Sequence, residues 1–230
     1  MREHLNKALE AAERDWRANV GEHHRPSLDR MFRASGFASQ CPRQADAKVP
    51  DWCGMAVGTW LVDGGINPAF ARSFLHCLNV EAFFTYGQRR NVNPRRLDTQ
   101  INLEGKWTSI EAFHGAPGSS MSRAWADRSE VLRRVDDEYH QATLFAPGDV
   151  VLLDWSGRDA ADHITMVHRW DGRTLVTIEG NASGAGPEGE RRRDAVVIRR
   201  LDLRESASRR LVYGRGRLSP MDFCTNAVKP

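Results

Sequence analysis

The chain contains little of what marks several common protein classes, beginning with cysteine. Its 230 residues include only four cysteines, Cys41, Cys53, Cys77 and Cys224, and no CxxC pair. So few cysteines at uneven spacing do not make a disulfide scaffold, and without CxxC pairs a structural zinc site is not expected. Whether Cys41, Cys77 or Cys224 forms a disulfide stays open from the sequence.

Net charge and long apolar runs are also lacking. The chain has 33 basic and 30 acidic residues, a net charge of +3, with basic residues scattered apart from the run at 191–193. That run is typical of a solvated hairpin tip, and we expect no nucleic-acid partner. No stretch approaches the roughly eighteen apolar residues of a membrane span. Residues 1–19 lack the apolar centre of a secretory signal, so we expect synthesis in the cytoplasm without a signal peptide.

What is present is enough apolar residues for a core, since hydrophobic residues make up 40% of the chain. Apolar spacing predicts that the first part is helical. The expected helices cover residues 3–19, 28–34, 50–64 with Asp51 as N-cap, 67–79 with 80–86 as a possible continuation, and 122–140. Residues 36–49 and 87–120 read as loops.

Beyond residue 146 the pattern changes to short β-branched or alternating runs separated by turns. Strands are expected at 150–154, 163–170, 174–179, 195–201 and 211–214. Helices followed by strands predict an α+β fold, with N-terminal helices packed on a C-terminal antiparallel sheet. We interpret 1–230 as a single domain: a helical leader (1–49), a helical and loop segment (50–145), the sheet (146–217) and a tail (218–230).

One cysteine, one histidine and one carboxylate occur in settings that suit nucleophilic catalysis. Cys53 opens a helix, where unpaired amides and the helix dipole favour the thiolate and the same amides can hold an oxyanion. The alternative is a buried structural cysteine. His163 begins a strand, and Glu179 ends the next one. Counted outward from the turn at 171–172, these two residues are nearly opposite, so a carboxylate can orient the ring. Asn181 is an alternative orienting residue.

Several segments together resemble a CHAP domain, a cysteine- and histidine-dependent amidohydrolase or peptidase. Each motif is weak alone, and their order along the chain makes the resemblance specific. The segments are Trp52-Cys53-Gly54, Pro147-Gly148-Asp149-Val150-Val151, Asp162-His163-Ile164, Ile178-Glu179-Gly180-Asn181-Ala182-Ser183 and Val212-Tyr213-Gly214-Arg215-Gly216-Arg217.

The resemblance implies a papain-like core, related to the NlpC-type peptidases, and a role for each matching residue. Cys53 is the nucleophile, His163 the general base and acid, Glu179 the orienting partner and Asn181 a supporting polar residue. Neither a metal nor an organic cofactor is needed for this chemistry.

Three further residues are candidates for substrate contact: Trp52, Asp162 and Trp155. Two of them have a simpler interpretation that the sequence favours. Trp155 is more often a packing residue of the core or rim than a sugar-stacking residue, and Asp162 is a solvated residue at a strand end.

By resemblance, the substrate is an amide bond in bacterial peptidoglycan, cut by an amidase or an endopeptidase. The protein is then a phage lysin or an exported antibacterial effector, which acts on the cell wall after release or export. An effector implies an immunity protein in its producer. Two alternatives stay open: a papain-like hydrolase of a cytoplasmic amide or isopeptide, and a catalytically silent binding module.

Overall fold

The computed structural model describes residues 1–36, 38, 41, 49–85, 102–103, 106–107, 124–218 and 222–223. The predicted loop at 36–49 lies mostly outside these residues, and the loop at 87–120 lies almost wholly outside them. Cys224 is outside them too, so its pairing is not described.

A six-stranded antiparallel sheet forms the centre of the fold, with strand order β3-β8-β4-β5-β6-β7. Its strands are β3 (Ala124–Asp127), β4 (Val150–Leu153), β5 (His163–Trp170), β6 (Thr174–Ala185), β7 (Arg191–Asp202) and β8 (Val212–Arg217). The helices are α1 (Arg2–Arg17), α2 (Arg25–Ala34), α3 (Cys53–Asp63), the 3-10 helix η2 (Pro68–Phe74), α4 (Cys77–Thr85), α7 (Arg128–Val135), α8 (Glu138–Leu144) and α9 (Ser206–Leu211). The two short strands β1 (Asn102–Leu103) and β2 (Lys106–Trp107) pair with each other. This arrangement confirms the predicted α+β class.

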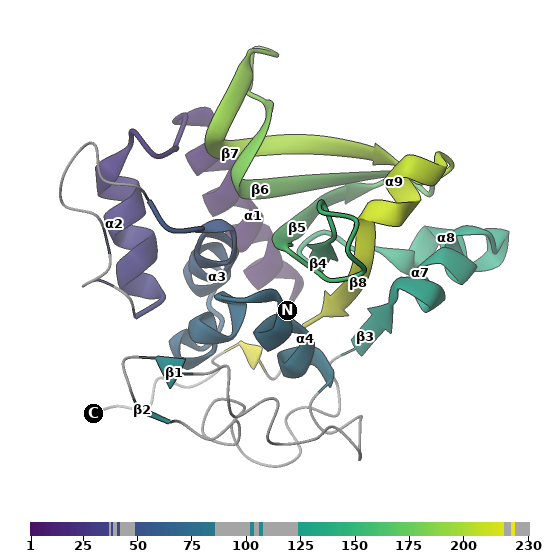
Figure 1. The fold of residues 1–230 in the computed structure, drawn as a ribbon, viewed down its shortest axis with the longest axis horizontal. Helices are drawn as coiled ribbons and strands as arrows, with labels where there is room; N and C mark the ends of the chain where they lie inside the picture. The colour runs from purple at the N-terminus through teal and green to yellow at the C-terminus, as the bar shows by residue number, and fades with distance from the viewer. Residues whose placement is uncertain are drawn as a thin grey trace.

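Helices cover both faces of the sheet, which is why β4 is buried along its whole length. Alternate side chains of a strand point to opposite faces. Val150 and Leu152 join the core formed with α1 to α4, whereas Val151 and Leu153 join a second core with α7 and α8. Figure 1 shows α1 to α4 on one side of the strands and α7 and α8 on the other.

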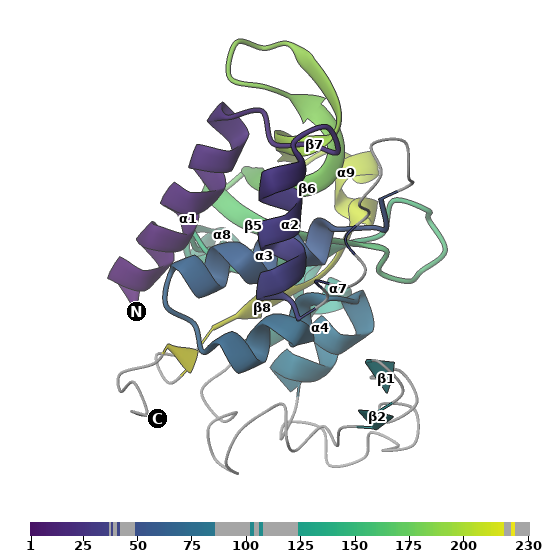
Figure 2. The same ribbon diagram turned by 90° about the vertical axis from the view of Figure 1, so that its left-hand side faces the viewer.

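The central helix α3 packs between the sheet and the other N-terminal helices. It contacts β5 and β6 on one side and α1, α2 and η2 on others, and Figure 2 shows it crossing behind α2 beside α1. Its first nine residues are buried, as the apolar run in the sequence predicts.

The predicted N-cap of this helix is wrong by one residue. Trp52 is the N-cap, with φ −120° and without a side-chain cap. The Trp52 carbonyl accepts the first helical hydrogen bond, from the Ala56 amide at 2.9 Å. The Asp51 side chain instead accepts a hydrogen bond from Asn181.

The predicted helix at 67–79 is two helices, η2 and α4, with a break at Leu75-His76. The end of η2 lies against the start of α3. A methyl group at Gly54 would lie only 1.7 Å from the Phe74 carbonyl oxygen, so the close approach requires glycine there. This contact lies directly before the break between η2 and α4.

The predicted helix at 122–140 is also wrong in part, because it begins with the edge strand β3. That strand pairs with β8, which carries Gly214 and Gly216. A side chain at Gly214 would overlap the ring of Trp125, and one at Gly216 the ring of Phe84. These glycines leave room for large aromatic rings. The apolar spacing within 122–140 does not reveal that this segment pairs with β8, which is distant in the sequence. Asp127 then caps α7 by accepting from the Glu130 amide at 3.0 Å.

The hairpin of β6 and β7 is longer than predicted at both arms. The strands extend to Ala185 and begin again at Arg191, so residues 191–193 belong to β7 and the tip is 186–190. The hairpin projects beyond the helices in both ribbon views (Figures 1 and 2).

None of the helices in the described part of the chain combines the length and the apolar character needed to cross a bilayer.

Candidate active site

Cys53 is the first residue of α3 and lies at the edge of the main core, with 9% of its surface exposed. The first amides of a helix have no intrahelical acceptor, and the positive end of the helix dipole lies beside them. Both effects favour a negative charge on the sulfur or on an oxygen bound next to it. The sequence prediction placed the cysteine in this setting.

His163 and Glu179 are brought together by the pairing of β5 with β6. The register pairs Met166 with Ile178, and one more step would set Glu179 across from Thr165, which lies on the same face as His163. The carboxylate therefore reaches the ring diagonally, and Nε2 of His163 lies 3.3 Å from Oε2 of Glu179. The sequence predicted that His163 and Glu179 lie nearly opposite each other. In the structure Glu179 is offset by two residues along β5, on the same face as His163.

Burial and close charge set the ionisation of this pair. Glu179 is fully buried and His163 is 7% exposed. Burial opposes the charge on the ring, but the contacts with Cys53 and Glu179 and their negative charges outweigh it and raise the pKa of His163 to about 10. Burial likewise opposes the charge on Glu179, yet the close contact and positive charge of His163, with Arg199 and Thr177, lower the pKa of that carboxyl. A charged His163 ring beside an ionised Glu179 carboxylate is thus favoured.

Two residues that the sequence did not single out also bind Glu179. The Thr177 hydroxyl donates to Oε1 at 2.6 Å, and Nε of Arg199 lies 3.2 Å from Oε1 and 3.1 Å from Oε2. Arg199 pairs directly with Thr177 across the β6–β7 register. The alternation of side chains along a strand could have identified these residues, because 177, 179 and 199 lie on the same face of the sheet. That inference needs the register of the β6–β7 hairpin, which the sequence alone does not give.

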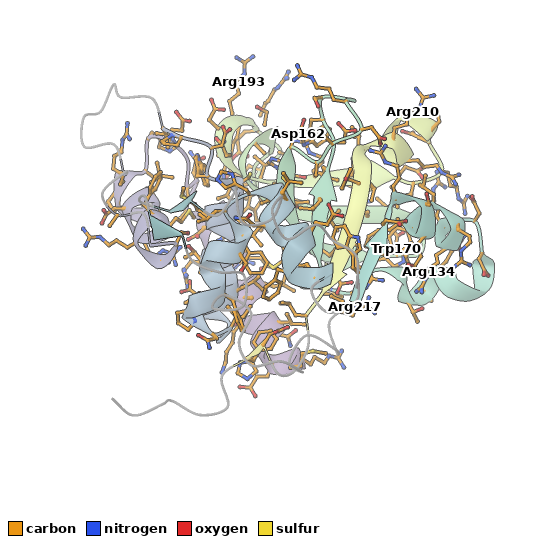
Figure 3. All side chains as sticks on the ribbon, turned by 60° about the horizontal axis from the view of Figure 1, so that its bottom comes forward. Arg134, Asp162, Trp170, Arg193, Arg210 and Arg217 are labelled. Atoms are coloured by element: carbon orange, nitrogen blue, oxygen red, sulfur yellow. The ribbon has the colours of Figure 1, made fainter. Side chains whose placement is uncertain are left out.

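The loop between β4 and β5 lies over this end of the sheet and carries Trp155. Both carboxylate oxygens of Asp162 accept backbone hydrogen bonds, from the amides of Trp155 and Ser156 at 2.8 Å each. The Trp155 ring lies 6.4 Å from the His163 ring, edge to face, and is 38% exposed. Asp162 therefore holds the loop, and Trp155 forms part of the rim. Figure 3 shows Asp162 at this end of the strands, with Trp170 at the far end of β5.

Asn181 and Trp52 both lie where β6 meets the start of α3. Asn181 has a left-handed backbone (φ 52°), and its Nδ2 donates to Oδ1 of Asp51 at 3.3 Å. It thus joins β6 to the residues that precede α3. Trp52 has no exposed surface and lies under Gly180, where a methyl group would approach its ring to 2.8 Å. In this conformation Trp52 supports the site from the core and cannot contact substrate.

A pocket of about 400 Å³ lies between the start of α4 and the loop that precedes β5. The described residues that line it are His76, Cys77, Leu78, Ala161 and Asp162. Burial, then the charges of Cys53 and Asp162, raise the pKa of the Cys77 thiol to about 12. Leu78 is 51% exposed and, with Trp155, gives the surface here two exposed apolar side chains.

The described cysteines and acidic groups show neither disulfides nor a metal centre. Cys41, Cys53 and Cys77 are free thiols. Within the described ranges, no three His, Cys, Asp or Glu side chains gather as metal ligands.

Comparison of the chain with protein-family models, with curated proteins and with solved structures finds no match in any of the three.

Proposed function

We propose that the chain is a cysteine hydrolase with a papain-like core, in which Cys53 attacks an amide carbonyl. One observation carries the proposal: a cysteine at a helix N-terminus adjoins a buried histidine whose Nε2 lies 3.3 Å from a buried carboxylate. Raising the pKa of His163 to about 10 keeps the ring charged and so favours the thiolate over the thiol.

The residues can carry out both halves of the hydrolysis. The Cys53 thiolate attacks the carbonyl carbon, and amides at the start of α3 stabilise the oxyanion. The tetrahedral intermediate expels the amine, which takes a proton from His163, and an acyl-enzyme remains. His163 then removes a proton from water, which attacks the thioester, and the acid and the thiolate are regenerated.

For the substrate, we propose the peptide part of bacterial peptidoglycan, as the CHAP-like motifs imply. The cleaved bond lies either between sugar and stem peptide or within the peptide. The protein then acts at the cell wall, as a phage lysin or as an exported effector that is paired with an immunity protein.

Purified peptidoglycan tests this proposal directly. Mass spectrometry of the soluble products after incubation identifies the cleaved bond, because an amidase frees intact stem peptides and an endopeptidase leaves them truncated. We expect Cys53→Ala to release nothing. Cys41→Ala is the matched control, because it removes a cysteine whose charged neighbours, Asp29, Arg25 and Arg33, belong to α2 and not to the site. Equal release by the wild type and Cys53→Ala would refute the proposed nucleophile.

Expression in a bacterium, with and without an added secretory signal, separates the wall from a cytoplasmic substrate. Lysis confined to the exported form with intact Cys53 supports the wall. Harm from the unexported form that depends on Cys53 would indicate an intracellular amide instead. No harm from any form, together with no released fragments, would favour a binding module.

A further inference from the structure

Glu179 lies between cations from both neighbouring strands. His163 of β5 approaches one side, and Arg199 of β7 approaches the other with Nε at 3.2 and 3.1 Å from the two oxygens. The second arm of the guanidinium, Nη2, donates to the Ser183 carbonyl at 2.7 Å. The carboxylate is thus fixed from the side opposite the histidine.

The flat face of the same guanidinium supports the rim of the site. Its central carbon lies 4.4 Å from the centre of the Trp155 ring, within the range of a cation–π contact. Trp155 in turn lies edge to face with His163. One side chain therefore touches both the buried carboxylate and the exposed aromatic ring beside it.

We propose that Arg199 is a positioning residue, which aims the Glu179 carboxylate at His163 and holds Trp155 where substrate binds. This role rests on the proposed function. Arginine suits it because a planar fork donates in two directions while its face stacks on an aromatic ring. A lysine supplies the charge without the fork.

The groups around Glu179 define what removing Arg199 changes. They are His163 from β5, Thr177 on β6 and Arg199 from β7, and His163 in turn interacts with Cys53 of α3. Arg199 lowers the pKa of Glu179 through its positive charge. Without it, Glu179 binds a proton at higher pH, and the imidazolium and thiolate lose their support there. The acidic limb of thiolate reactivity then moves to higher pH.

The test compares Arg199→Gln and Arg199→Lys with Arg200→Gln, whose parent residue is exposed and next on the same strand. The first readout needs no substrate: the rate of Cys53 alkylation by iodoacetamide across pH. We expect Arg199→Gln to move its acidic limb up by about one pH unit. In Arg199→Lys the acidic limb should lie close to its wild-type pH, and in Arg200→Gln it should not move.

The second readout is hydrolysis of peptidoglycan, in which both Arg199 variants should raise KM about five-fold through loss of the Trp155 contact. An unshifted alkylation limb in Arg199→Gln, or the same shift in Arg200→Gln, would overturn the proposal. If Arg199→Gln does not fold, the KM of Arg199→Lys is the deciding measurement. A KM equal to that of the wild type would count against the positioning role of Arg199. A shifted limb in a protein that does not hydrolyse peptidoglycan would refute the proposed function and leave the positioning role standing.

Discussion

Replacing Glu179 with glutamine tests the charge balance of the site most directly. The change keeps the size of the side chain and an oxygen that Thr177 can reach, but it removes the negative charge 3.3 Å from His163. A close opposite charge contributes about one to three pKa units. We therefore expect the pKa of His163 to fall from about 10 to between roughly 7 and 9.

The expected loss can be worked out for pH 9. With a pKa of about 10, some nine tenths of His163 carries a proton. With a pKa of ~8, about one tenth does. Since the imidazolium protonates the leaving amine, kcat/KM at pH 9 should fall about ten-fold through protonation alone. The basic limb of the pH profile should move down by the same number of units as the pKa.

The assay is a pH titration of the His163 ring by NMR with labelled histidine, alongside hydrolysis rates. Glu13→Gln is the matched control, because Glu13 makes a similar contact with His168 at 2.8 Å away from the site. An unchanged His163 pKa in Glu179→Gln would refute the electrostatic reasoning, whatever the hydrolysis rate did.

The same shift links the site to stability. A histidine whose pKa is raised by folding from 6.5 to about 10 stabilises the fold fully below pH 6.5. That contribution is lost as the pH rises through about 10. The free energy of unfolding in urea should therefore decrease between pH 6.5 and about pH 10 in the wild type. The decrease should be smaller in Glu179→Gln.

Three further predictions concern the surroundings of the site. Iodoacetamide at pH 8 should label Cys53 well before Cys77, whose pKa of about 12 keeps it a thiol; peptide mapping that finds Cys77 labelled first would contradict this. Gly180→Ala should destabilise the fold by about 1–3 kcal/mol in urea, because its methyl group would lie 2.5 Å from a carbon of α3; wild-type stability would count against that packing. Asp162→Asn should raise KM several-fold with kcat nearly unchanged, because it loosens only the loop, and a loss confined to kcat would show that Asp162 acts on the chemistry.

The sequence predicted the elements whose pattern is local. The apolar stripe of α1, the all-round apolar run of α3 and the alternation in β5 each lie within one segment, so their predicted and observed bounds differ by only a few residues. The strand β3 was missed because its place depends on pairing with glycines of β8 some ninety residues away. Its own residues do not carry that information.

The candidate site divides in the same way. Cys53 and His163 were found because each begins an element. Glu179 was found by counting outward from the turn at 171–172, although β6 continues past it to Ala185. Arg199 was not found, since its parity with Glu179 depends on a register that bulges between Glu179 and Ala182. Asn181, the alternative orienting residue, donates to Asp51, and its left-handed backbone interrupts the strand alternation on which its predicted side was based.

The energetics of the row formed by His163, Glu179 and Arg199 favour a chemical role over a structural one. Removing a carboxylate from water costs several kcal/mol, and an apolar side chain of similar size often stabilises a fold as well or better. In this protein the fully buried Glu179 has cations on both sides, at the point where Cys53 opens a helix. A module that only binds gains nothing from a histidine held charged to about pH 10, whereas that charge stabilises a thiolate nucleophile. The cost of burying these groups therefore supports the hydrolase proposal over the binding module.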